Sequence, residues 1–158
     1  MKRITYWPQA WLGLTFNWGV LLGYASYGGA WPGGAAALLY IAGLFWTLGY
    51  DSIYALQDKD DDKIASVKST ALLFGDKIIY YVMVFYFICH GLIAASAYFA
   101  KAGVLFWPVW LLAFAHSTWQ ARLLHFKGID SRENALDLFK SNRDYALMVA
   151  SALFLGLF

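Results

Sequence analysis

Residues 35–64 read AAALLYIAGLFWTLGYDSIYALQDKDDDKI, an apolar run that ends in a cluster of acidic residues. The run from Ala35 to Leu56 has the length of a membrane-crossing helix, because about 20 mostly apolar residues span a bilayer core. Its one charged residue is Asp51, which precedes Asp58 by seven positions. On a continuous helix Asp51 lies roughly 10 Å deeper than Asp58, and a carboxylate at that depth usually faces a bundle interior or a wet cavity. The stretch therefore predicts a membrane helix with a functional carboxylate near its polar end.

The composition of the whole chain agrees with a membrane protein. Of its 158 residues, 61% are hydrophobic and 14% are charged, whereas soluble domains average roughly 45–50% apolar and about 25% charged residues. This hydrophobicity excludes a disordered chain, and the single cysteine, Cys89, excludes a disulfide scaffold and a cysteine-ligated zinc site. The net charge of +2 gives no reason to expect nucleic acid as a partner. We expect a single all-α membrane domain over residues 1–158.

Apolar segments along the chain predict a multi-pass bundle of about five transmembrane helices. The segments are residues 10–30, 35–56, 78–100, 104–124 and 146–158. The glycine-rich connection at residues 28–34 predicts a tight hairpin between the first two segments. The fifth segment is short, so it needs preceding residues, a tilt or a locally thin bilayer to cross.

The cationic residues lie almost entirely on one side of this predicted arrangement. If the five segments cross alternately, eleven Lys and Arg residues share one side and Lys101 faces the other. The positive-inside rule then places the amino terminus and both polar loops in the cytoplasm, at an inner (plasma) membrane. On the same side, we interpret Arg122, His125 and Lys127 as a membrane-surface cluster that faces anionic lipid.

The acidic residues after the second segment predict a metal and phosphate site. At about 100° per residue, Asp58 and Asp62 lie about 20° to either side of Asp51 if the helix continues. Three carboxylates on one face repel one another unless a cation lies among them, and hard oxygen ligands suit Mg²⁺, which recruits phosphate oxygens. Nearby lysines such as Lys68 supply contacts to those phosphates. The alternative is a solvated polar loop, which we favour for Asp60.

The residues from Tyr50 to Gly75 resemble the second aspartate-rich motif of the UbiA-type intramembrane aromatic prenyltransferases. The matching residues are Tyr50, Asp51, Tyr54, Ala55, Asp58, Asp60, Asp61, Asp62, Lys63 and the run from Ile64 to Gly75. The stretch is especially similar to the 4-hydroxybenzoate polyprenyltransferase branch of ubiquinone biosynthesis. A weaker resemblance covers the whole chain: residues 1–9 resemble the segment after the family's fourth helix, and residues 139–143 resemble its last cytoplasmic loop.

The resemblance implies Mg²⁺-dependent transfer of a polyprenyl group from polyprenyl diphosphate to an aromatic acceptor, 4-hydroxybenzoate. Mg²⁺ withdraws charge from the leaving diphosphate, and aromatic ring faces stabilise the allylic cation. By residue-level match, the metal ligands would be Asp51, Asp58 and Asp62, of which Asp51 and Asp58 would be catalytic. The substrate-binding residues would be Tyr50, Tyr54, Lys68 and Lys2.

The chain resembles the carboxyl-terminal half of a nine-helix family bundle and lacks the Asn-Asp pair of the family's first motif. We therefore expect an incomplete activity from this chain alone. Several alternatives stay open: a truncated reading frame, a fragment, one partner of a split enzyme whose second chain carries the first motif, or a non-catalytic membrane subunit. A transporter ranks last, because Asp51 alone is clearly intramembrane in the sequence.

Overall fold

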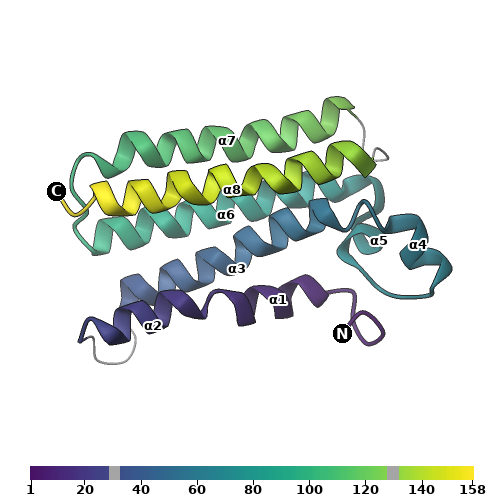
Figure 1. Ribbon diagram of the computed structural model, residues 1–158, viewed down its shortest axis with the longest axis horizontal. Helices are drawn as coiled ribbons and strands as arrows, with labels where there is room; N and C mark the ends of the chain where they lie inside the picture. Colours follow the sequence, from purple (N-terminus) through teal and green to yellow (C-terminus); the bar gives the residue numbers. More distant parts are fainter. Residues whose placement is uncertain (29–32, 128–131) are drawn as a thin grey trace.

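Helices make up all regular structure in the part of the chain that the structure describes. The computed structural model describes residues 1–28, 33–127 and 132–158. Long helices form an elongated bundle (Figure 1), namely α3 (Gly34–Tyr54), α6 (Ile78–Phe99), α7 (Phe106–Lys127) and α8 (Arg132–Leu155). Helix α3 packs against α6 and α8, and α7 also packs against both of these helices. The predicted all-α class is confirmed.

The first predicted segment, residues 10–30, is interrupted rather than continuous. It forms α1 (Pro8–Phe16) and α2 (Trp18–Ser26), which both lie along α3. Each is about 14 Å long, so neither alone crosses an apolar core of about 30 Å. The interruption is at Asn17, whose carboxamide nitrogen donates to the Gly13 carbonyl (2.6 Å) and to Thr47 Oγ1 on α3 (3.2 Å). This amide thus binds backbone and side-chain partners where the helix stops.

Among the described residues, two stretches are long and apolar enough to cross a membrane, residues 34–54 and 70–99. The second comprises α5 (Thr70–Phe74), the 3₁₀ turn η1 (Gly75–Lys77) and α6. The predicted bounds 35–56 and 78–100 agree with α3 and α6 to within two residues. The other crossings stay predictions, and most of the hairpin predicted at 28–34 lies outside the described residues.

Helix α8 begins fourteen residues before the predicted fifth segment. Its 24 residues correspond to about 36 Å, so no thin bilayer is needed to explain a short helix. Of the three options for this segment, the structure supports the use of preceding residues. The predicted start at residue 146 was too late because residues 132–144 are mostly polar. They are nevertheless helical, since Ala135, Leu138, Asn142 and Tyr145 recur every three or four positions and are all buried.

Close approach of α3 and α6 depends on Gly49. A Cβ atom at this position would overlap the ring of the buried Tyr86. Small residues let membrane helices approach closely enough for their backbones to pack. Gly49 therefore sets the spacing of α3 and α6 near the carboxyl-terminal end of α3.

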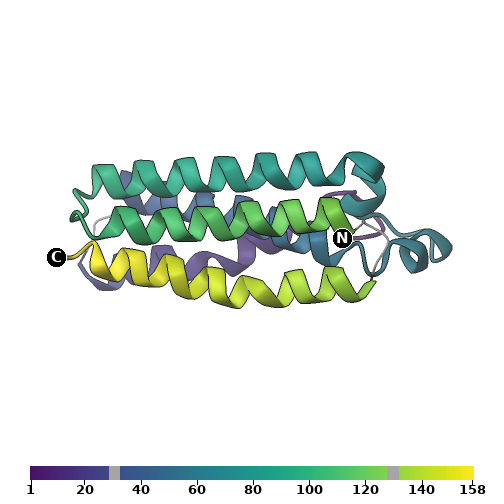
Figure 2. The ribbon, with the colours of Figure 1, turned by 90° about the horizontal axis from the view of Figure 1, so that it is seen from above.

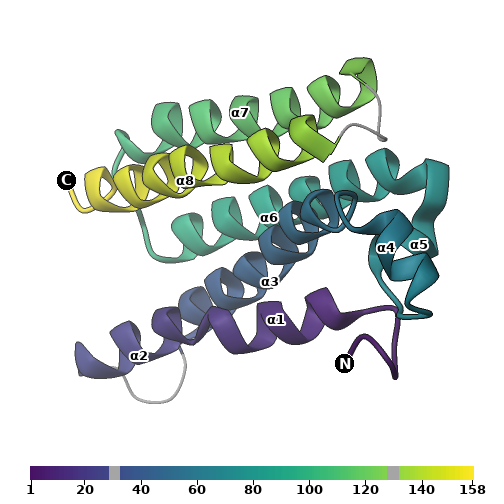
Figure 3. The same cartoon turned by 45° about the vertical axis from the view of Figure 1, so that its right-hand side comes forward.

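Polar segments from different parts of the chain lie at one end of the bundle. Figures 1 and 3 show the amino terminus, α4 (Lys59–Ile64) and α5 beside the carboxyl-terminal end of α3. The end of α7 and the beginning of α8 lie at the same end, and the carboxyl terminus lies at the other, as Figure 2 also shows. Two polar regions that are distant in sequence thus lie at the same end of the bundle.

Candidate active site

Asp51 lies in the last turn of α3, at the polar end of the bundle. Its carboxylate is half-buried, whereas the following Ser52 is fully buried. The hydroxyl oxygens of Ser52 and Thr70 share a 2.8 Å hydrogen bond that joins the end of α3 to the start of α5. Ser69 caps α5 by accepting from the backbone N–H of Leu72. The loop after α3 is therefore folded back and fixed beside Asp51.

The acidic stretch is not one continuous helix, so the predicted stripe of Asp51, Asp58 and Asp62 is wrong in its geometry. Helix α3 ends at Tyr54, and Asp58 immediately precedes α4. In between, backbone amides bond to carbonyls three residues earlier, the tighter 3₁₀ pattern. This turn lets both Ala55 and Leu56 enter the core. Within the described ranges, no three His, Cys, Asp or Glu side chains gather closely enough to hold a metal ion.

Residues 1–7, which precede α1 and which we call the amino-terminal arm, bind the acidic segment 58–62. The contact joins Lys2 to Asp62. Lys2 Nζ donates to both carboxylate oxygens of Asp62, at 3.0 and 3.3 Å. Asp62 is 6% exposed, while the Lys2 side chain is 44% exposed. The ammonium charge also acts electrostatically on the Asp51 carboxylate. Lys2 therefore binds one predicted metal ligand, Asp62, and is still partly exposed to a substrate.

Lys68 also binds the amino-terminal arm. Its backbone N–H donates to the Lys2 carbonyl at 2.7 Å, and its Nζ donates to the Ile4 carbonyl at 3.1 Å. The ammonium also lies 5.4 Å from the ring centre of Tyr6, which is cation–π distance. The structure thus brings together Lys2 and Lys68, the two lysines predicted to contact phosphate, although 66 positions separate them in the sequence.

Aromatic rings lead from this end of the molecule into the bundle. The rings of Tyr54 and Tyr50 contact Phe139 of α8, with centroid distances of 4.7 and 5.8 Å. Tyr50 packs edge-on against Trp46 at 5.1 Å, and Trp46 lies 5.2 Å from Tyr145. Because successive rings are in contact, they form a continuous path between α3 and α8. We refer to Tyr54, Phe139, Tyr50, Trp46 and Tyr145 as the aromatic path.

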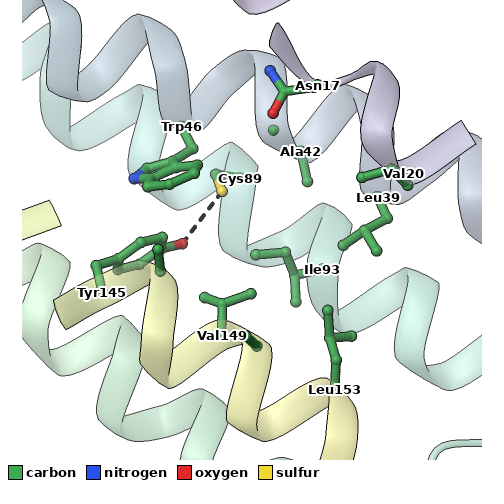
Figure 4. A pocket seen from close by; sticks show the side chains of 13 residues that line it. Asn17, Val20, Leu39, Ala42, Trp46, Cys89, Ile93, Tyr145, Val149 and Leu153 are labelled. Carbon is green, nitrogen blue, oxygen red and sulfur yellow. Dashed lines mark hydrogen bonds between the residues drawn. The ribbon is translucent and has the colours of Figure 1, made fainter. Parts of the chain in front are cut away.

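The inner end of the aromatic path borders a cavity of about 200 Å³ (Figure 4). Trp46 and Tyr145 lie at one end of it, and Leu39, Ile93 and Val149 are among its apolar lining residues. Tyr145 Oη is 3.6 Å from Cys89 Sγ. The lining is predominantly apolar, so the cavity suits a hydrocarbon chain better than a charged group.

Two of the three predicted magnesium ligands, Asp51 and Asp58, differ from the third in their hydrogen bonding. Mg²⁺ in proteins is commonly held by one or two carboxylates together with substrate phosphates. Asp51 and Asp58 are half-buried, and neither carboxylate has a hydrogen-bond partner among the described residues. Asp62 differs, because both of its oxygens accept from Lys2. Its geometry therefore suits a residue that orients a lysine.

The sequence interpretation missed the contribution of α8. Residues 139–143, predicted as a cytoplasmic loop, lie inside that helix. Asn142 Oδ1 accepts from the Trp46 indole N–H at 3.0 Å, and Phe139 and Tyr145 contribute to the aromatic path. The three-to-four-residue spacing of buried side chains along residues 135–145 is the signal that would have revealed this helix.

The model of the UbiA prenyltransferase family matches residues 1–143, a range that contains both site lysines and the whole acidic stretch. This chain belongs to the UbiA prenyltransferase family. As a member of a membrane-embedded family, it is a membrane protein. The match ends just before Tyr145, so it covers all but the last ring of the aromatic path.

Relatives of this UbiA family chain are named as 4-hydroxybenzoate polyprenyltransferases or geranyltransferases. The mitochondrial 4-hydroxybenzoate polyprenyltransferases of Arabidopsis thaliana and Bos taurus are 38% and 39% identical over 156 residues, which is 99% of this chain. These matches cover 38% and 41% of the relatives' lengths. The 4-hydroxybenzoate geranyltransferase 2 of Lithospermum erythrorhizon is 36% identical, with 99% of this chain and 50% of the relative covered. The chain thus spans half or less of these relatives, and no solved structure matches it significantly.

Proposed function

We propose that this chain supplies the second aspartate-rich part of a magnesium-dependent site that transfers a polyprenyl group to 4-hydroxybenzoate, in ubiquinone biosynthesis. The observation that carries the proposal is the joint position of Lys2, Lys68 and Asp62 at the polar end of the bundle. The last turn of α3, which contains Asp51, and the outer end of the aromatic path lie at the same end. Cations and carboxylates suit a metal-bound diphosphate, and an apolar cavity suits the attached hydrocarbon. An allylic diphosphate combines these two chemistries in one molecule.

The polar end would bind the diphosphate of the donor. Lys2 and Lys68 would donate charge-assisted hydrogen bonds to its oxygens, and Asp62 would orient the Lys2 ammonium. Asp51 and Asp58 would hold Mg²⁺, which supplies Lewis-acid stabilisation of the departing diphosphate. The allylic C–O bond then breaks and the diphosphate leaves with the bonding electrons.

The aromatic path would receive the allylic end of the donor and the acceptor ring. Ring faces attract a cation within about 6 Å of their centres, so Tyr50, Tyr54 and Trp46 suit stabilisation of the allylic carbon as positive charge develops. A carbon of the acceptor ring forms the new C–C bond, and its proton is lost. The apolar cavity beyond Trp46 would hold part of the prenyl chain away from water.

The basic end of the bundle would face the cytoplasm of a cell in which the chain lies in the plasma membrane. Support comes from the shared position of the amino terminus, α4 and α5 at one end (Figure 1), because excess Lys and Arg remains on the cytoplasmic side. Some relatives' names include "mitochondrial", so the corresponding membrane in eukaryotes would be that of an organelle.

The complete reaction would use residues beyond those present here, since the relatives extend well beyond the matched segment. A second chain that supplies them is one proposal, although the relatives' names give it no support. The competing proposal is a membrane subunit without catalysis. The two differ in one respect: a catalytic half binds an allylic diphosphate with Mg²⁺, and an inert subunit does not.

The test is the affinity of the purified chain for geranyl diphosphate, measured by titration calorimetry with and without Mg²⁺. We expect weak binding that strengthens with Mg²⁺ in the parent chain and is reduced about tenfold in Asp51→Asn and in Asp58→Asn, the loss of one charge-assisted contact. Asp76→Asn is the matched control, because Asp76 is exposed on η1 at the same end of the bundle. Equal affinity of all variants would contradict the proposal.

A further inference from the structure

A groove runs between α6 and α7 on a face of the bundle that the aromatic path does not use. Its outer part is a hollow of about 370 Å³ lined by Ile79, Met83, Ala121, Arg122 and His125. A deeper hollow of about 150 Å³ shares Met83 and Ala121 with the first. The shared residues join the two hollows into one groove, which we refer to as the α6–α7 groove.

The mouth of the α6–α7 groove is cationic. Arg122 is exposed, and its guanidinium has no ion pair or hydrogen bond with any other described residue. His125, one helical turn further along α7, lines the same mouth. Both lie near the end of α7, at the polar end of the bundle (Figure 1). A guanidinium with five donors and no acceptor suits a phosphate group.

The groove becomes apolar below its mouth. Phe87 and Phe114 line the deeper part, and from Arg122 to Phe114 the groove descends roughly 12 Å along α7. Tyr86, which is 2% exposed, also lines this part. A ligand with an anionic head and a hydrocarbon tail would match both the mouth and the interior of the groove.

We propose that the α6–α7 groove binds one anionic phospholipid, with its phosphate at Arg122 and one acyl chain between the two helices. The phosphate would lie at the basic end of the molecule, where anionic lipid headgroups attract Arg and Lys. The proposal rests on the membrane location of the chain and does not depend on prenyl transfer.

The test is native mass spectrometry of the purified chain with dioleoylphosphatidylglycerol, and with dioleoylphosphatidylcholine as the zwitterionic probe. We expect one preferentially bound phosphatidylglycerol, and a preference reduced roughly fivefold in Arg122→Gln, from the loss of one cation near the surface. Arg122→Lys should retain most of the preference. Lys101→Gln, which removes an exposed cation at the opposite end, should leave it unchanged.

A second variant tests the acyl chain. Met83→Trp fills the groove from a residue that is 48% exposed, and it should weaken the binding of both lipids. Met83→Phe repeats the test with a smaller side chain if the tryptophan lowers the melting temperature. Binding equal to that of the parent in the Arg122→Gln or the Met83 variants would overturn the proposal. Displacement by inorganic phosphate would also overturn it, because it indicates a phosphate site without a lipid chain. Geranyl diphosphate affinity should be unchanged by Arg122→Gln, so this test and that of the proposed function fail independently.

Discussion

Lys2 links the stability of the polar end to its proposed chemistry. Its ammonium compensates the Asp62 carboxylate, which is almost completely removed from water. Loss of one partner of such a pair leaves a buried charge without compensation, and that is more harmful than loss of both partners. The same ammonium is the group that we propose to meet the diphosphate. One contact thus affects both folding and binding.

We predict that Lys2→Met lowers the unfolding free energy by about 1–3 kcal/mol, the typical penalty for a buried polar group left without its partner. The variant should also bind geranyl diphosphate about tenfold more weakly with Mg²⁺ present. Denaturant unfolding in detergent and calorimetry measure the two effects.

The double variant Lys2→Met/Asp62→Asn separates these effects. Without the carboxylate charge, most of the stability should return, while the affinity for the diphosphate should stay low. Recovery of both properties would show that Lys2 serves only to neutralise Asp62.

Trp46 couples the aromatic path to α8 through its indole N–H. We predict that Trp46→Phe keeps a ring in the path but lowers stability by about 1–2 kcal/mol, because Asn142 Oδ1 loses its donor at 3.0 Å. Thermal unfolding monitored by circular dichroism checks this value. Tyr98→Phe is the control, since Tyr98 is 72% exposed, and a similar loss of stability there would contradict the assignment.

At the scale of the helices, the length of an apolar run predicted the bounds of α3 and α6 well. It predicted the wrong bounds where polar residues occur within or before a helix. Asn17 interrupts a run that hydropathy treats as continuous, because its carboxamide binds Gly13 and Thr47. Helix α8 extends through a charged segment, because one face of that segment is buried against α3 and α7. The two errors have different origins: the contacts of the Asn17 carboxamide leave no trace in hydropathy, whereas the helical periodicity of residues 135–145 is present in the sequence but is masked by their low mean hydropathy.

The contact between α3 and α6 gives a prediction at this scale. Gly49→Val should lower the melting temperature in detergent and reduce stability by about 1–3 kcal/mol, because the added carbons overlap the Tyr86 ring and separate the helices. Gly91→Ala on α6 is the matched control, since a Cβ there meets no atom within 4 Å. It should be neutral or slightly stabilising. Equal destabilisation by both substitutions would indicate that helix spacing is not set at Gly49.

For the molecule as a whole, the sequence predicts a chemistry for the site but not the geometry of its residues. The residue types at Asp51, Asp58 and Lys68 indicate magnesium and phosphate from charge alone. Their arrangement depends on a 3₁₀ turn after Tyr54 and on the return of the amino-terminal arm to Asp62. Neither follows from helical periodicity, because the turn breaks the helical hydrogen-bond pattern locally and the arm is held by a contact between residues 60 positions apart.

The orientation of the bundle gives a prediction on the same scale. Ala65 is exposed near α4, and Val104 is 77% exposed at the opposite end. In intact cells, a membrane-impermeant maleimide should label Val104→Cys from outside and leave Ala65→Cys unlabelled until the cells are opened. The native Cys89 is buried, so its background should be low. Labelling of Ala65→Cys in intact cells would contradict the proposed orientation.

The most direct test of the central claim is the amount of Mn²⁺, as a spectroscopic substitute for Mg²⁺, that the chain retains in equilibrium dialysis. Electron paramagnetic resonance counts the ion with and without geranyl diphosphate. We predict retention that requires the diphosphate and is lost in the double variant Asp51→Asn/Asp58→Asn but not in Asp76→Asn. Retention that is independent of the diphosphate, or that survives the loss of both carboxylates, would contradict it.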